Sequence, residues 1–297
     1  MSRSVLSRVA RPAIMLAALI TLLDLGALQV HAGTMYVAQI AQNQYGHLDQ
    51  ANVPFPPGGG GDNSCVPTAV TNSIVMLQNL YPQVYGNMLV AAPGGNAQLI
   101  ATAQAVGALM GTTSNNGTSF TGWVDGTFSY MENNAPGKTV YNAQIGQFNN
   151  QNLYTGNHTF VQNVNPTALF IYNELNLGED VEIAIVPNAA GIGHCLTISS
   201  ISWNDVNMDG ILDGTETATL DGIDPAGGAN FGPGNNPIVL TAAGDNGQLQ
   251  LTYGGVAYSF AGAYAQSPVP VPASIVLCLS GSVILLAWRQ WTMALAA

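Results

Sequence analysis

Three residues that lie far apart in the sequence carry side chains suited to nucleophilic chemistry. Cys65 follows a glycine-rich loop and stands at the start of a predicted helix, where the helix dipole and free N–H groups favour a thiolate and can hold an oxyanion. His194 opens a predicted strand directly after Gly193, which allows close approach of backbone or substrate. Asp224 follows a later strand, where a carboxylate can fix the tautomer of an imidazole.

A second set of residues matches a calcium-binding loop. Residues 205–216 satisfy the pattern D-x-[DN]-x-[DN]-G-x₅-E without a mismatch. The predicted ligands are Asp205, Asn207, Asp209, the carbonyl of Ile211, Asp213 and Glu216. These hard oxygen donors favour Ca²⁺ over zinc. Strands are expected on both sides, so the loop would stabilise a hairpin; the alternative is an acidic surface loop that holds no metal.

The composition excludes one class of function and favours another. Charged residues make up 7% of the 297 residues and the net charge is −11. Residues 33–268 contain 15 carboxylates (16 in the chain less Asp24) and one lysine, Lys138, which gives −14. Without a basic patch the protein cannot neutralise phosphates, which argues against nucleic acid as a partner. An acidic chain rich in glycine and asparagine is instead suited to export and to binding metal ions.

The elements that must position these residues are helices first and strands afterwards. The apolar spacing predicts helices over Cys65–Leu80, Asn96–Met110, Phe120–Met131 and Pro166–Leu175. The β-branched segments predict strands over Thr139–Ile145, Val181–Val186, Cys195–Trp203, Thr217–Leu220, Gln248–Tyr253 and Ala257–Ala261. This order predicts an α+β fold, with N-terminal helices that carry the cysteine and an antiparallel sheet that carries the histidine and the aspartate.

A helix-borne Cys, a strand-borne His and a following Asp resemble the papain-like cysteine peptidases, in particular the bacteriocin-leader (double-glycine) peptidase branch. The resemblance spans roughly residues 60–262 and implies a papain-like fold. It implies that Cys65 is the nucleophile, His194 the general base and Asp224 the orienting group. The glutamine that this branch places about six residues before the cysteine is replaced by Gly59, and Asn63 is the nearest substitute amide for the oxyanion hole.

Other readings of the same residues stay open. Gln50 carries an amide but lies far upstream of the cysteine. In an oxidising compartment Cys65 and Cys195 could form a disulfide, or Cys65 could be a buried structural residue of an inactive relative. His47 and His158 lie in polar stretches and are expected at the surface.

The two ends of the chain carry signals for export. Three arginines precede an apolar run from Ala13 to Val30, so residues 1–32 are predicted to be a signal peptide, the alternative being an uncleaved anchor. Near the other end, a Pro-rich segment precedes the uncharged run Ala273–Trp288 and then Arg289. This arrangement resembles the PEP-CTERM sorting signal of bacterial exopolysaccharide producers, with Val271 where that signal usually carries Glu. The resemblance implies a sorting enzyme of the inner membrane as a partner and a tail that holds the protein in the membrane before processing.

The predicted organisation is a signal peptide (1–32), an N-terminal segment with a Gly/Pro-rich loop (33–61), a papain-like domain (62–265) that includes the calcium loop, a Pro-rich spacer (266–272) and a hydrophobic sorting segment (273–297). The predicted function is that of an exported cysteine peptidase homologue of the bacterial cell envelope or extracellular matrix, acting on a peptide or protein. The alternatives are an inactive calcium-binding surface or matrix protein with the same fold, and a β-rich exopolysaccharide-binding protein.

Overall fold

A computed structural model describes residues 33–55, 63–91, 95–148, 151–188, 193–227, 238–243 and 248–269. The predicted signal peptide (1–32), the sorting segment (273–297) and part of the Pro-rich spacer lie outside the described residues. Within the described ranges, no helix combines the length and the apolar character that crossing a membrane requires.

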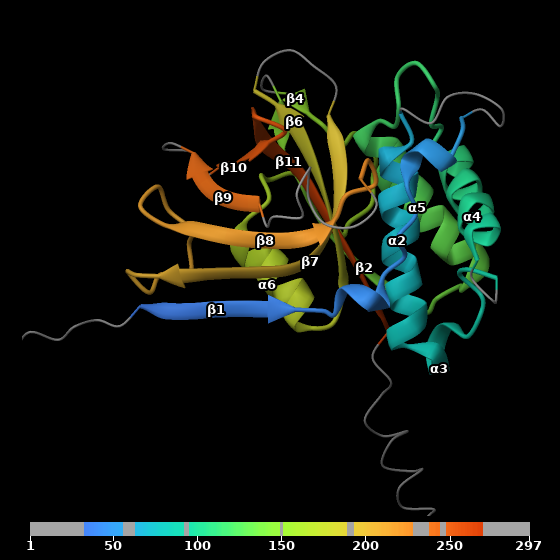
Figure 1. Cartoon of the computed structure of the whole chain (residues 1–297), viewed down its shortest axis with the longest axis horizontal. Helices are drawn as coiled ribbons and strands as arrows, with labels where there is room; N and C mark the ends of the chain where they lie inside the picture. The colour runs from blue at the N-terminus through green and yellow to red at the C-terminus, as the bar shows by residue number, and fades with distance from the viewer. Residues whose placement is uncertain are drawn as a thin grey trace, which may run out of the picture.

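The described chain contains strands, helices and two short 3-10 segments (Figure 1). The strands are β1 (Thr34–Gln39), β2 (Thr139–Ile145), β3 (Gln147–Phe148), β4 (Gln151–Asn152), β5 (Val161–Gln162), β6 (Asp180–Pro187), β7 (His194–Asp205), β8 (Thr217–Ile223), β9 (Ile238–Ala243), β10 (Gln248–Tyr253) and β11 (Val256–Pro268). The helices are α2 (Cys65–Leu80), α3 (Pro82–Tyr85), α4 (Asn96–Leu109), α5 (Phe120–Asn134) and α6 (Ala168–Asn176), with 3-10 segments η1 (Gln42–Gln44) and η2 (Gln50–Asn52).

The strands form a closed ring, and this overturns the predicted fold class. Strand β6 pairs with both β7 and β11, while β7–β8–β9–β10–β11 follow one another as antiparallel neighbours, so the six strands close on themselves. Strands β1, β2 and β5 extend this ring. The prediction of a papain-like α+β fold, with helices followed by a sheet, is therefore wrong. The long strands β7 and β11 each pair with three neighbours, a feature that local sequence patterns do not contain.

The helices that matter for the site pack on one side of this ring. Helix α2 lies against β6 and β7, and α4 and α5 pack beside it, as Figure 1 shows. Thr197 of β7 fixes the contact between α2 and the sheet, because its hydroxyl donates to the carbonyl of Ala69 at 2.9 Å. Ser119 caps α5 by accepting a hydrogen bond from the N–H of Gly122.

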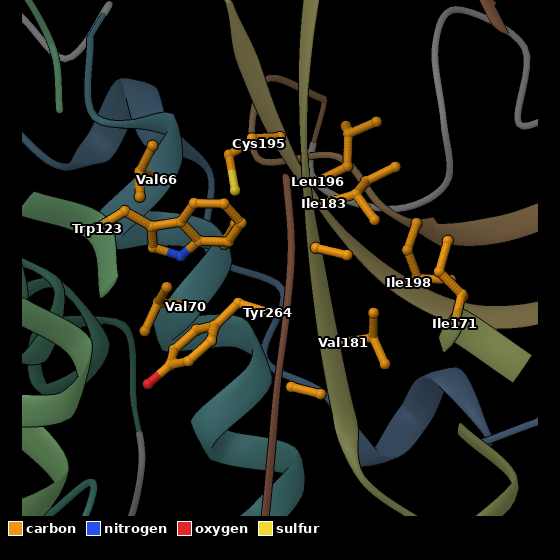
Figure 2. Close-up of a cluster of buried hydrophobic side chains, with 14 of the residues drawn as sticks. Val66, Val70, Trp123, Ile171, Val181, Ile183, Cys195, Leu196, Ile198 and Tyr264 are labelled. Carbon is orange, nitrogen blue, oxygen red and sulfur yellow. The ribbon is translucent and has the colours of Figure 1, made fainter. Parts of the chain in front are cut away.

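Apolar side chains on both faces of the paired strands hold these layers together. Figure 2 shows Val66 and Val70 of α2 next to Trp123 of α5, with Cys195 and Tyr264 of the sheet facing them. On the other face of the same strands lie Ile171, Val181, Ile183, Leu196 and Ile198. Cys195 therefore belongs to the core between the helices and the sheet.

The segment before the helices is also part of the core. Strand β1 pairs with the second half of β7, from Thr34 opposite Asp205 to Gln39 opposite Ser200. Ala38, Ile40, Tyr45, Leu48, Val53 and Phe55 are buried. The first described residues thus pack between β7 and α2, next to the elements that carry the candidate site.

Candidate functional site

The structure brings the cysteine, histidine and aspartate singled out above into one site. Cys65 is the first residue of α2, His194 the first residue of β7, and Asp224 follows the last residue of β8. Strands β7 and β8 are antiparallel neighbours, so the start of one lies beside the end of the other. The start of α2 reaches the same place because that helix packs across β6 and β7.

The imidazole of His194 lies between an acid and a thiol. Its Nε2 is 2.8 Å from Oδ1 of Asp224, and the Cys65 side chain forms a second hydrogen bond with the ring. Burial alone would lower the pKa of His194, but the hydrogen bonds with Asp224 and Cys65 raise it to about 9. The ring is therefore protonated at neutral pH, and an imidazolium next to a thiol favours the thiolate.

Asp224 is held as a carboxylate. It is 2% exposed, and burial would raise its pKa, yet the hydrogen bonds and the charge of its neighbours lower it. His194 makes the largest of these contributions, followed by the hydroxyl of Tyr253 and the N–H of Ala226 at 2.8 Å. The aspartate is thus ionised and fixed by donors on more than one side.

Tyr253 is a site residue that the sequence analysis missed. It ends β10, and its hydroxyl donates a hydrogen bond to Oδ2 of Asp224. Its ring also stacks on His194, with ring centroids 5.4 Å apart and an interplanar angle of 27°. Burial and the charge of Asp224 raise the pKa of Tyr253, so its hydroxyl stays a donor. An aromatic residue at a strand end is common, and only the closed ring of strands places this one beside Asp224.

The candidate amide Asn63 has another partner. Its side-chain amide donates to the carbonyl of Ser114, so Asn63 fastens the loop that follows α4. Gln50, set aside because it lies far upstream, has its main chain in the site. Its N–H donates to the carbonyl of Pro225 at 2.7 Å, and its own carbonyl accepts a hydrogen bond from the hydroxyl of Ser64 at 3.0 Å. Gln50 thus joins the segment after Asp224 to the residue before Cys65.

The two cysteines of the described chain do not form a disulfide. Cys65 and Cys195 are both free thiols. Cys195 is fully buried, and burial raises its pKa well above the usual value. Since a buried neutral thiol is inert, Cys195 serves as an internal comparison for the reactivity of Cys65.

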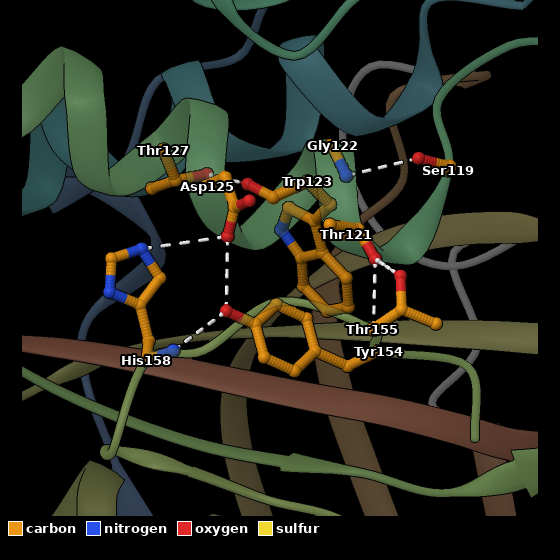
Figure 3. Close-up of polar contacts among 9 residues, drawn as sticks. All are labelled: Ser119, Thr121, Gly122, Trp123, Asp125, Thr127, Tyr154, Thr155 and His158. Carbon is orange, nitrogen blue, oxygen red and sulfur yellow. Dashed lines mark hydrogen bonds and ion pairs between the residues drawn. The ribbon is translucent and has the colours of Figure 1, made fainter.

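The other two histidines of the described chain lie elsewhere. His47 is exposed, as expected. His158, also expected at the surface, is half-buried: its Nε2 is 3.5 Å from Asp125 and its ring stacks on Phe160. Figure 3 shows this pair together with Tyr154, whose hydroxyl donates to the same carboxylate at 3.1 Å. These contacts fasten α5 to the segment that leads into β5.

The predicted calcium loop connects β7 to β8, in the hairpin position that the sequence indicates. Its first and last carboxylates are buried: Asp205 accepts hydrogen bonds from the N–H groups of Met208 and Gly210, and Glu216 accepts one from Val206. Met208 and Gly210 have positive φ angles of 60° and 74°, which turn the backbone sharply. Backbone N–H groups thus occupy oxygens that would also be calcium ligands.

The remaining loop side chains contact one another. The amide of Asn207 donates to Asp209 at 3.1 Å and to Asp213 at 3.2 Å, and the N–H of Ile211 donates to Asp209 at 2.8 Å. Hydrogen bonds from Thr215 lower the pKa of Asp213. In the described part of the chain, no three His, Cys, Asp or Glu side chains gather in a metal-binding arrangement. The donor types suit calcium, and hydrogen bonds within the loop hold the same side chains near one another.

Comparisons with known protein families and with curated proteins give no match to this chain.

Proposed function

We propose that the protein is a cysteine peptidase, with Cys65 and His194 as catalytic residues and Asp224 as the positioning residue of the histidine. One observation carries this proposal: His194 is bonded to a buried carboxylate on one side and to the thiol of Cys65 on the other. A catalytic triad is recognised by the same geometry, in which a nucleophile contacts a base and the base contacts an orienting group.

In the proposed acylation step the thiolate of Cys65 attacks the carbonyl carbon of a peptide bond. The C–N bond then breaks, the imidazolium of His194 gives its proton to the leaving amine, and a thioester on Cys65 remains. In the second step a water molecule gives a proton to His194 and attacks the thioester. The C–S bond breaks, the acid product leaves, and the thiolate and imidazolium are restored.

Each tetrahedral intermediate carries an oxyanion that needs hydrogen-bond donors. Helix α2 begins at Cys65, and the first N–H groups of a helix have no partner within the helix. We propose the amide of Gln50 as the side-chain donor in place of Asn63, because the main chain of Gln50 is bonded to Ser64, next to Cys65, and to Pro225, next to Asp224, whereas the amide of Asn63 is bonded to Ser114. The proposed donor lies in the segment before the Gly/Pro-rich loop.

We propose Tyr253 as a second positioning residue, and Tyr253→Phe tests its contact with Asp224. The substitution keeps the ring that stacks on His194 and removes the hydroxyl. Because that hydroxyl lowers the pKa of Asp224, its loss should let Asp224 become protonated at a higher pH. We expect the acidic limb of the pH profile of Cys65 alkylation to move to higher pH.

The matched control for this variant is Tyr258→Phe. Tyr258 contacts Tyr253 edge-on, at a centroid distance of 5.8 Å, and should leave the profile in place. An unchanged profile in Tyr253→Phe would show that the hydroxyl has no influence on the site.

We propose that the loop over residues 205–216 binds Ca²⁺ and stabilises the β7–β8 hairpin, and with it His194 and Asp224 at the other end of those strands. The support is the complete sequence pattern and the burial of Asp205 and Glu216 at its two ends. Calcium would be held by the side chains of Asp205, Asn207, Asp209, Asp213 and Glu216 and the carbonyl of Ile211.

Millimolar Ca²⁺ is expected to raise the melting temperature by about 5–10 °C when its concentration is about 100 times Kd. Glu216→Gln should remove most of that shift, whereas Asp125→Asn, a carboxylate change on α5, should keep it. Differential scanning calorimetry with Ca²⁺, Mg²⁺ or a chelator measures the effect. A melting temperature that is the same with Ca²⁺ and with chelator would contradict calcium binding.

We propose export to the bacterial envelope as the setting, with retention through the C-terminal segment before processing. This proposal is supported by the sequence patterns of residues 1–32 and 266–297. Extracellular calcium modules bind with Kd values of about 10⁻⁴–10⁻³ M, which fits a calcium loop in an exported protein. Its substrates would be peptides or proteins of the same compartment.

The peptidase proposal is tested with iodoacetamide, peptide mapping and a mixed peptide pool. At pH 6 a substoichiometric amount of reagent should label Cys65 and leave Cys195 unlabelled. Peptides of the pool should be cleaved by the wild type and not by Cys65→Ser. A Cys65 that reacts no faster than a free cysteine, or a pool left intact, would favour the alternative of a catalytically inactive calcium-binding matrix protein.

A further inference from the structure

An apolar pocket lies directly beside Cys65 and His194. Its walls are formed by Val66 of α2, Phe120 and Trp123 of α5, and Ala184 and Val186 of β6. Cys65, Gly193 and His194 also line it, so a group held in this pocket is in reach of the thiol. The described residues of its lining include no carboxylate, lysine or arginine side chain.

The size of the pocket limits what can enter. Its volume is about 160 Å³, and an apolar cavity of about 150 Å³ is large enough to hold benzene. A phenyl ring or a branched aliphatic side chain therefore fits. Asn63, Asn116 and Ser119 contribute polar groups to the lining, where a peptide backbone could form hydrogen bonds.

The walls are fixed before any ligand arrives. Trp123 is 1% exposed and packs so closely on β11 that a β-carbon at Gly262 would lie 2.9 Å from its ring. Figure 3 shows the bonds that hold the first turns of α5: Ser119 accepts from Gly122, and the hydroxyls of Thr121 and Thr155 are 3.1 Å apart. Because these side chains need no reordering, little conformational entropy is lost when an apolar group enters.

The charge of the surroundings selects against ionic groups. A carboxylate in the pocket would find no lysine or arginine there, and the His194 imidazolium is already bonded to Asp224 and Cys65. An ammonium group would lose its hydration with no carboxylate in the described lining to replace it. An uncharged apolar group instead gains the full benefit of burial. Size, rigidity and charge thus point to the same class of ligand.

We infer that this pocket is a specificity site that binds one uncharged aromatic or branched aliphatic side chain of the substrate, next to the carbonyl that Cys65 attacks. The inference rests on the proposed function, since it assigns a substrate class to that same site. It makes the enzyme selective for peptides with a phenylalanine- or leucine-sized residue beside the cleaved bond and unable to use an acidic residue there.

The test uses three alkylating probes of the same reactive group: iodoacetamide, N-benzyl iodoacetamide and iodoacetate. Each rate with Cys65 at pH 6 is divided by the rate of the same probe with glutathione. We expect N-benzyl iodoacetamide to be favoured at least tenfold over iodoacetamide, and iodoacetate to be disfavoured. Ala184→Leu, which fills the pocket from β6, should remove the preference for the benzyl probe, and Val66→Ala, which enlarges the pocket, should keep or increase it.

Val140→Leu serves as the matched control, because Val140 is exposed on β2, away from the pocket, and should keep the wild-type ratios. Equal normalised rates for the benzyl and unsubstituted probes, or a preference for iodoacetate, would overturn the inference and leave the peptidase proposal standing. A wild-type Cys65 that reacts slowly with all three probes would overturn both.

Discussion

Replacing His194 with alanine is expected to slow the alkylation of Cys65 by iodoacetamide about 100-fold at pH 6. The pKa of His194 is raised to about 9 by Asp224 and Cys65 against the effect of burial, so the ring is an imidazolium at pH 6. Iodoacetamide reacts with the thiolate form of a cysteine, and a neighbouring imidazolium favours that form. At pH 9 the two proteins should react at similar rates.

His158→Ala is the matched control for this experiment. His158 also lies close to a carboxylate, 3.5 Å from Asp125, but it is not among the residues that line the pocket beside Cys65. Its removal should leave the alkylation rate unchanged, which separates a specific effect of His194 from the general loss of a histidine. Equal rates for the wild type and His194→Ala at pH 6 would mean that Cys65 and His194 do not form an ion pair.

The second large effect is expected in the stability of the fold, which should fall as the pH rises from about 5 to 8.5. Asp180 and Glu182 of β6 are fully buried. The described ranges contain one lysine, Lys138, and no arginine, so basic side chains that could pair with these acids are scarce there. Burial raises the pKa of Glu182 to about 8, and burial together with the charge of Glu182 raises the pKa of Asp180. These acids therefore keep protons in the folded state that the unfolded chain, with an ordinary glutamate value of 4.5, has already released.

A folded state that binds more protons loses stability as the pH rises through this window. A pKa difference of only two units corresponds to about 2.7 kcal/mol, which lowers the melting temperature of a domain of this size by about 5–10 °C. Glu182→Gln has nearly the same shape and no proton to lose, so its melting temperature should fall much less between pH 5 and 8.5. Asp224 acts outside this window, because its lowered pKa affects stability only below about pH 4. The raised pKa of His194 acts within it and in the same direction, so the slope that remains in Glu182→Gln is expected to come partly from His194.

Thermal melts at fixed ionic strength and with chelator present measure this effect. Glu132→Gln, a change to a half-buried acid on α5 bonded to Tyr141, is the matched control and should retain the wild-type slope. A wild-type melting temperature that rises between pH 5 and 8.5 would contradict neutral buried acids at Asp180 and Glu182.

Local sequence patterns predicted most of the individual elements. Helix α2 and strands β2 and β10 have the predicted bounds, and most other predicted elements are present with ends shifted by one to three residues. Strand β11 is the exception, because it ends at Pro268 and not at the predicted Ala261. Apolar periodicity, a Pro in the first turn of α2 and runs of β-branched residues each involve only a few neighbouring residues. Such short-range signals determine whether a segment forms a helix or a strand, so the individual elements could be predicted from them.

The pairing of distant strands could not be predicted from such local signals. Because the fold class depends on that pairing, the predicted fold class was wrong. Strand β1 carries exposed apolar residues at Met35 and Val37, so it lacks the one-sided pattern of an ordinary strand. The closure of the ring depends on β6 pairing with β11 across about 80 residues. Tyr253 and Gln50 were missed for the same reason, since each reaches the site only through long-range pairing or a loop that folds back.

The central claim is that Cys65, His194 and Asp224 act as one unit, and the titration of the His194 imidazole by NMR tests it most directly. The resonance is assigned by its absence in His194→Ala. We predict a midpoint of about pH 9 in the wild type, and a decrease of at least one unit in both Cys65→Ala and Asp224→Asn. A midpoint at or below the ordinary histidine value of 6.5, unchanged by Cys65→Ala, would contradict the claim.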